Sequence, residues 1–276
     1  YYHEDNFARV PELNYVWPTV EQYHPDAYAL TILSTYLSSG KSAPFYKVMV
    51  EDKKLTSGVS AQFYASEIAG QFSLSSRAFP GTDLNTLAEG FAAAFRKFEA
   101  EGIPEKDLNR IKAGQERAFY NSLSSVLGKS ASLAQYSIFA GDPGYATEDI
   151  KKLLAVSAED VIRVYKKYIQ NKNYVATSFV PKGAAHLALE GSRKADVVEE
   201  KIVSGAEGAI DASKAATYTK TPSKIDRAKE PPYGKALKIA PPKVWEKTLS
   251  QGVKVFGIES HEVPLIQLNF RLRGGQ

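Results

Sequence analysis

Cysteine is absent from this chain of 276 residues. Disulfide bonds, zinc ribbons and thiol nucleophiles are therefore excluded from it. The mean hydropathy is −0.29, and no run approaches the ~20 consecutive apolar residues that a membrane helix needs. We therefore expect no membrane-spanning segment.

A strong charge of one sign is also missing. The 35 basic and 31 acidic residues leave a net charge of +4 and a pI near 8.9. This surplus is spread along the chain, whereas nucleic-acid binding usually needs a concentrated basic face. A lysine-rich stretch, 214–247, favours nucleic acid, but aromatic and basic residues do not alternate there on one face. No nucleic-acid partner is expected.

Neither end of the sequence carries a recognisable signal. The chain opens at Tyr1 without an initiator methionine or an apolar leader, and it ends at Gly274-Gly275-Gln276. We expect an internal piece of a longer protein, whose localisation signal lies outside this stretch. The localisation is therefore unknown from this stretch, and the periplasm or cell envelope is the expectation with which the lack of cysteine agrees.

The first part of the chain alternates between strand and helix patterns. Strand-like spacing covers 8–20, and a helical pattern starts at His24-Pro25-Asp26 and ends at Gly40. A short helix is expected over 44–53. Two strands, 57–66 and 70–79, are joined by a connection short enough for an antiparallel hairpin.

Helical patterns then dominate 83–169, and a strand is predicted over 174–180. Blocks of helices beside a hairpin favour an α+β fold with a mainly antiparallel sheet and helices layered on one face. We assign this domain to 1–183.

The composition changes after this domain. Residues 184–244 are rich in Ala, Lys, Ser, Thr and Pro, which is typical of a linker, with a short helix around 195–206 as one option. Strands are expected at 247–249, 252–258 and 263–272. We interpret 245–276 as the truncated first strands of a following domain.

The sequence shows no residue spacing typical of a catalytic or metal-binding site. The four histidines, His3, His24, His186 and His261, do not share helix-turn spacing with one another or with a zinc-helix glutamate. They are predicted to be solvated or capping residues. Acid pairs such as Glu99 with Glu101 are predicted to be solvating charge on exposed helix faces.

Two triplets, Gly40-Lys41-Ser42 and Gly128-Lys129-Ser130, have the end of a phosphate-binding loop but lack its earlier glycine. Both are predicted to be turns at helix ends. We therefore predict no catalytic, cofactor-binding or metal-binding residue in this chain.

Several short sequence motifs, which follow one another in a fixed order, resemble those of a known protein family. The first runs from His24-Pro25-Asp26 to Tyr46 across a small-residue turn, and the second is Gly102-Ile103-Pro104-Glu105 before a long helix. The third is Ser157-Ala158-Glu159-Asp160 followed by Asn173-Tyr174-Val175. The tail from Leu249 to Gly275 adds a fourth. Together they resemble the non-zinc second domain of the insulinase (pitrilysin) family of zinc metallopeptidases, with the linker and the first strands of the next domain.

The resemblance implies a two-half protease whose four homologous α+β domains enclose an unfolded peptide. Its zinc motif, His-x-x-Glu-His, is absent here, so zinc is expected in another domain of the parent protein. The family also uses an Arg and a Tyr to support the oxyanion. Val50 and Ser57 stand at the matching positions, so this role is missing too.

The resemblance leaves two functions open. The chain is either a non-catalytic wall of a zinc endopeptidase, or part of a catalytically inactive scaffold or partner subunit of the same fold. Its expected partners are other domains of the same polypeptide and, in the first case, an unfolded peptide substrate. An upstream His-x-x-Glu-His would favour the first function.

Overall fold

The computed structural model describes residues 1–197, 224, 226, 228–230, 232–235, 240–272 and 274. Residues 1–197 hold a five-stranded sheet and the helices that cover it. A separate two-stranded hairpin follows in 244–258.

The five-stranded sheet has the order β1-β5-β2-β4-β3. The strands are β1 (Tyr2–Asp5), β2 (Glu12–Thr19), β3 (Thr56–Ala65), β4 (Gly70–Ala78) and β5 (Val175–Pro181). Every pair is antiparallel except β1 with β5, which is parallel. The predicted α+β class with a mainly antiparallel sheet is confirmed, as is the hairpin of β3 and β4.

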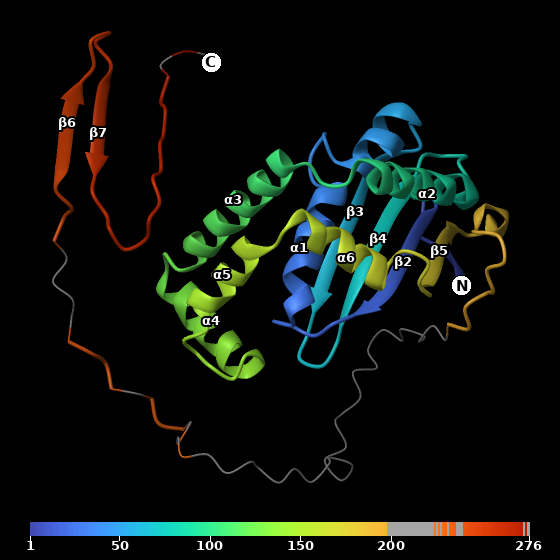
Figure 1. The fold of residues 1–276 in the computed structure, drawn as a ribbon, viewed down its shortest axis with the longest axis horizontal. Helices are drawn as coiled ribbons and strands as arrows, with labels where there is room; N and C mark the ends of the chain where they lie inside the picture. The colour runs from blue at the N-terminus through green and yellow to red at the C-terminus, as the bar shows by residue number, and fades with distance from the viewer. Residues whose placement is uncertain are drawn as a thin grey trace, which may run out of the picture. The chain divides into compact units, whose positions relative to one another are not determined.

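The helices fall into two groups. Figure 1 shows α1, α2 and α6 along one face of the sheet, with α3, α4 and α5 following one another beside them. Their bounds are α1 Pro25–Ser38, α2 Leu84–Glu101, α3 Glu105–Ser122, α4 Val126–Phe139, α5 Ala146–Ala155 and α6 Ala158–Tyr168, with a π-helix η1 at Tyr46–Asp52 and a 3-10 turn η2 at Ala185–Leu187.

Apolar residues at every second position of the strands form the core. In β2, Leu13, Tyr15 and Trp17 point toward the helices and are buried, while the residues between them are half-buried. The Tyr15 ring meets the Phe91 ring of α2 edge-on, with 5.3 Å between centroids. These contacts fix α2 over the middle of the sheet.

The strand β1 was not expected from the sequence. Its residues Tyr-His-Glu-Asp are all half-buried and show no apolar alternation. The strand forms because β5 offers it a parallel partner. Its other edge is partly covered, because the Tyr2 N–H donates to the Arg193 carbonyl (2.8 Å) and the Ala195 N–H donates to the Tyr2 carbonyl (2.8 Å).

The hairpin of β6 (Val244–Thr248) and β7 (Lys254–Ile258) is described by itself. Its strands lie close to those expected at 247–249 and 252–258. Gly257 is required there, because a Cβ atom would lie 2.1 Å from the Trp245 ring. The strand expected at 263–272 is wrong, since these residues have no strand partner within the described chain and therefore form no ladder.

The predicted domain boundaries, 1–183, 184–244 and 245–276, stay predictions. The option of a helix around 195–206 falls, from residue 198 onward, outside the described residues, as does much of the lysine-rich stretch. No helix in the described part of the chain is long and apolar enough to cross a membrane.

Candidate functional site

The four histidines belong to different segments of the chain. His24 is the N-cap of α1, where its Nδ1 accepts the Asp26 backbone N–H at 3.0 Å, so the capping role predicted for it is observed. The His3 ring lies edge-on to Phe179, and His186 lies in η2. His261 lies 3.9 Å from a Glu259 carboxylate oxygen on an exposed surface.

Within the described ranges, no group of three or more His, Asp or Glu side chains is arranged to hold a metal ion. These residues therefore do not fit a zinc ion, and no step of peptide hydrolysis follows from them.

Val50 and Ser57 lie near the start of the edge strand. Val50 belongs to η1, and Ser57 lies in a β-bulge between Thr56 and Val59. The bulge is held from β4, since the Ser76 hydroxyl contacts the Thr56 hydroxyl at 3.0 Å and donates to the Gly58 carbonyl at 2.9 Å. Valine has no polar side-chain atom, and a serine hydroxyl carries no charge. Neither replaces an arginine beside an oxyanion.

The two glycine-lysine-serine triplets have different settings. Gly40 follows α1 with a φ of 89°, so Gly40-Lys41-Ser42 is a turn at a helix end, as predicted. For Gly128-Lys129-Ser130 the prediction of a turn is wrong, because these residues form the first turn of α4. The Ser125 hydroxyl caps that turn by accepting the Gly128 N–H at 3.0 Å. The start of α4 was not predicted, because the apolar residues just before Gly128 continue the helical pattern of the preceding segment.

Glu99 also departs from its prediction. Although it lies on an exposed face of α2, its Oε1 accepts the Tyr165 hydroxyl at 2.7 Å and the Gln170 amide at 2.9 Å. It therefore ties α2 to α6 and is more than solvating charge. Glu101 does lie at the surface, where it pairs with Lys97.

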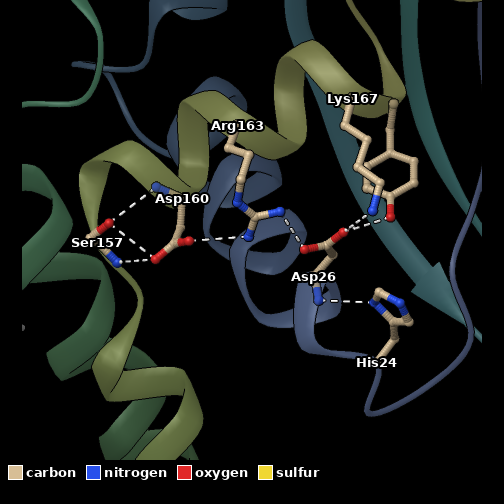
Figure 2. A network of polar contacts seen from close by, with 7 residues as sticks. His24, Asp26, Ser157, Asp160, Arg163 and Lys167 are labelled. Carbon is tan, nitrogen blue, oxygen red and sulfur yellow. Dashed lines mark hydrogen bonds and ion pairs between the residues drawn. The ribbon is translucent and has the colours of Figure 1, made fainter.

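A network of charges joins α1 to α6 (Figure 2). One oxygen of Asp26 accepts the Arg163 guanidinium at 2.6 Å, and the other accepts the Lys167 ammonium and the Tyr168 hydroxyl, each at 2.7 Å. Only 6% of the Asp26 side chain is exposed, whereas Arg163 and Lys167 are about half exposed. A second arm of Arg163 reaches Asp160 at 3.1 Å.

The pKa values of both carboxyl groups follow from these contacts. Burial by itself raises the pKa of Asp26, but hydrogen bonds from Lys167, Tyr168 and Arg163 outweigh it and hold this pKa well below 3.8. The Ser157 backbone N–H lowers the pKa of Asp160, with further help from Arg163. Asp160 and Ser157 form the capping box of α6. The network holds α6 against α1, so we interpret it as structural.

The strand β3 is the open edge of the sheet. It lies last in the strand order and has no strand partner on its outer side within the described chain. Its ten residues, Thr56–Ala65, run beside α1, whose Ser38 hydroxyl reaches the Ala61 carbonyl at 3.4 Å. An open edge of this length offers backbone donors and acceptors to an added strand.

Comparison with known proteins agrees with the fold and with the lack of a zinc ligand set in the described residues. Residues 1–115 match the peptidase M16 inactive domain. The predicted resemblance to a non-zinc domain of this zinc-peptidase family is confirmed.

Three matches illustrate the similarity. A curated relative, the zinc protease PqqE of Helicobacter pylori, is 24% identical over 148 residues, which are 54% of this chain and 33% of that protein. The crystal structure of a protease from Helicobacter pylori superposes with a TM-score of 0.59 and 20% identity, covering 66% of this chain and 43% of that one. The periplasmic protease PqqL of Escherichia coli reaches a TM-score of 0.53 and 18% identity, covering 66% and 20%.

At such identities the structural matches establish the fold alone. The chain spans a third of the length of the curated relative. Activity, substrates and partners of a whole protein are therefore matters for proposal.

Proposed function

We propose that this chain is a non-catalytic domain of a zinc-dependent metalloendopeptidase, in which it forms part of the wall around a peptide. The zinc ion would lie in another domain of the same polypeptide. Residues 184–244 would link this domain to a following homologous one that begins at 245. The open edge of β3 is the observation that carries the proposal.

The two edges of the sheet differ in a way that favours β3 as the peptide-binding edge. On β1, hydrogen bonds at Tyr2 to Arg193 and Ala195 already occupy part of the outer side. On β3, no strand pairs with the outer side within the described structure, and a side chain of α1, Ser38, reaches one of its carbonyls, that of Ala61. An unfolded peptide has unpaired backbone groups along its whole length, so strand addition suits it without a demand on its sequence.

The face of the sheet opposite the helices also suits a wall. One row across four strands consists of Ser60, Ser75, Asn14 and Thr177, which are neighbours in register. All four are half-buried polar residues, whereas the helix-covered face is apolar. Such a face can border an aqueous chamber without exposing core side chains.

The surface of α4 favours protein partners. Four of its apolar side chains are between 52% and 81% exposed: Val126, Leu127, Leu133 and Ile138. Tyr136 of the same helix is buried. We infer that another domain of the parent covers this face. The same observation supports the alternative, an inactive scaffold or partner subunit, because that role also needs a protein interface.

A periplasmic location is part of the proposal. It is supported by the lack of cysteine and by the fold shared with PqqL, which is a periplasmic protease. Fractionation of cells that express a tagged parent protein tests this location, and the tag is expected in the periplasmic fraction.

Backbone hydrogen exchange tests the peptide-binding role. The chain is incubated with an unfolded peptide, and exchange is compared with and without it. Amides of β3 are expected to exchange several-fold more slowly with peptide, because an added strand bonds to them. Amides of β1 serve as the internal control and are expected to stay unchanged. Protection of neither strand, or of β1 alone, would overturn the proposal and leave the scaffold role.

A further inference from the structure

A cavity of about 520 Å³ opens beside the end of β3. Its wall is built by α1, α3, α4 and α5, by Phe63, Tyr64 and Ala65 of β3, and by the loop before α1. A hydrogen bond from the Gln22 N–H to the Ser66 carbonyl (2.9 Å) holds this loop against the end of β3. The cavity therefore has a fixed rim at the place where an added strand would pass.

The wall combines aromatic rings with uncharged polar groups. Tyr23 and Tyr28 line it from the loop and α1, and Phe63 and Phe119 line it from β3 and α3. Three glutamines, Gln22, Gln115 and Gln135, add amide oxygens. Aromatic faces attract cations, and amide oxygens accept hydrogen bonds from them.

One carboxylate completes the wall. Asp149, in the first turn of α5, is the one charged side chain among the described residues that line the cavity. Its Oδ2 accepts the Tyr136 hydroxyl at 2.8 Å, and the same carboxylate lies close enough to the Tyr28 hydroxyl to raise the pKa of that tyrosine, after the larger effect of burial. Lys152, a nearby cation, is not among the lining residues, and its ammonium donates to the Tyr145 hydroxyl at 2.8 Å.

The residues that line the cavity favour a basic group over an anionic or a purely apolar one. An anion would meet the Asp149 carboxylate, and no cationic side chain lines the cavity among the described residues, so its binding is unfavourable. A purely apolar group would displace water from the charged Asp149 carboxylate and offer it no hydrogen-bond donor in exchange. A basic side chain avoids this cost, because its apolar stem packs on the rings and its charged end reaches the carboxylate.

We propose that this cavity receives a lysine or arginine side chain of a peptide added to β3. Side chains of an added strand alternate between the two faces of the sheet, so one of them enters on the side of α1, where the cavity lies. This inference rests on the proposed function and adds to it a preference for basic peptides.

Two short, fluorescently labelled unfolded peptides test the inference by anisotropy. One contains a single lysine, and the other has norleucine in its place. We expect the lysine peptide to bind the full chain about tenfold more tightly, since a cation over aromatic rings beside a carboxylate gains roughly 1 to 2 kcal/mol. Added salt is expected to reduce the difference.

Two variants and two matched controls locate the effect. Asp149→Asn removes the charge while its remaining oxygen still accepts the Tyr136 hydroxyl, and Ala118→Trp fills the cavity from an exposed position on α3. Both are expected to abolish the preference for lysine. Glu148→Gln and Ala113→Trp make the same changes at exposed positions outside the cavity, and both should retain the preference.

The outcomes distinguish the two proposals. Equal binding of both peptides, or a preference that survives both Asp149→Asn and Ala118→Trp, would overturn the basic-side-chain site and leave strand addition standing. Binding of neither peptide would overturn the peptide-binding role and the cavity inference together. Thermal melting of each variant confirms that the comparison is made on folded protein.

Discussion

Asp26 concentrates three partners from α6 on one buried carboxylate. Asp26→Asn is expected to lower the free energy of unfolding by about 2 to 3 kcal/mol, because charge-assisted bonds are lost while Arg163 and Lys167 can turn to water. Asp107→Asn, at an exposed pair with Arg110, is the matched control and should change stability by less than about 0.5 kcal/mol. Urea denaturation measures both. Equal effects would contradict a special role for Asp26.

The same carboxylate predicts an effect of pH. The pKa of Asp26 lies far below 3.8 in the folded chain and near its ordinary value when unfolded. Its contribution is therefore complete above about pH 5 and is lost as pH falls below about 4, where the unfolded state takes up the proton first. The stability difference between wild type and Asp26→Asn should shrink from pH 6 to pH 3, measured by denaturation at each pH. A constant difference would contradict this.

Local side-chain roles were only partly predictable. The capping role of His24 follows from its place before Pro25 and Asp26, because a helix start needs an acceptor there. The bond from Tyr165 to Glu99 could not be predicted, since the two residues are 66 positions apart and meet only after α2 and α6 pack. The cavity beside β3 was missed for the same reason, because its wall comes from six separate segments.

Among the helices, two glycines should respond oppositely to alanine. At Gly128, in the first turn of α4, a Cβ atom would lie 1.8 Å from the Ser122 carbonyl oxygen. Gly128→Ala should therefore displace the turn between α3 and α4 and lower the melting temperature. At Gly114, inside α3, a Cβ meets nothing within 4 Å, so Gly114→Ala should stabilise the chain by about 0.5 to 1 kcal/mol.

Calorimetry compares the two variants with wild type. Stabilisation by Gly128→Ala would show that the close approach of Gly128 to Ser122 does not limit the packing of α4, and destabilisation by Gly114→Ala would contradict the prediction for α3.

Elements with strong local patterns were predicted from the sequence. The helix α1 and the hairpin of β3 and β4 have apolar residues at the required spacing, so their own residues specify them. The strand β1 has no such pattern, and only the partner β5, more than 170 residues away, makes it a strand. For 263–272 the pattern of a strand is present but a partner is not, within the described residues.

For the whole chain, we expect neither stoichiometric zinc nor peptide cleavage. The described residues do not assemble a zinc ligand set, and the proposal assigns zinc to another domain. Metal analysis after equilibration with zinc and dialysis measures the first, and a peptidase assay with zinc supplied measures the second. One tightly bound zinc per chain would contradict the assignment of a non-catalytic domain.

The open side of β3 has a consequence for handling the protein. Backbone groups recognise other backbones without regard to sequence, so β3 of a second copy is as acceptable a neighbour as a peptide. Concentrated samples will therefore tend toward edge-to-edge self-association, and dilution will favour monomers. A peptide bound along β3 would also keep the protein soluble, because it would block pairing of that strand with a second copy.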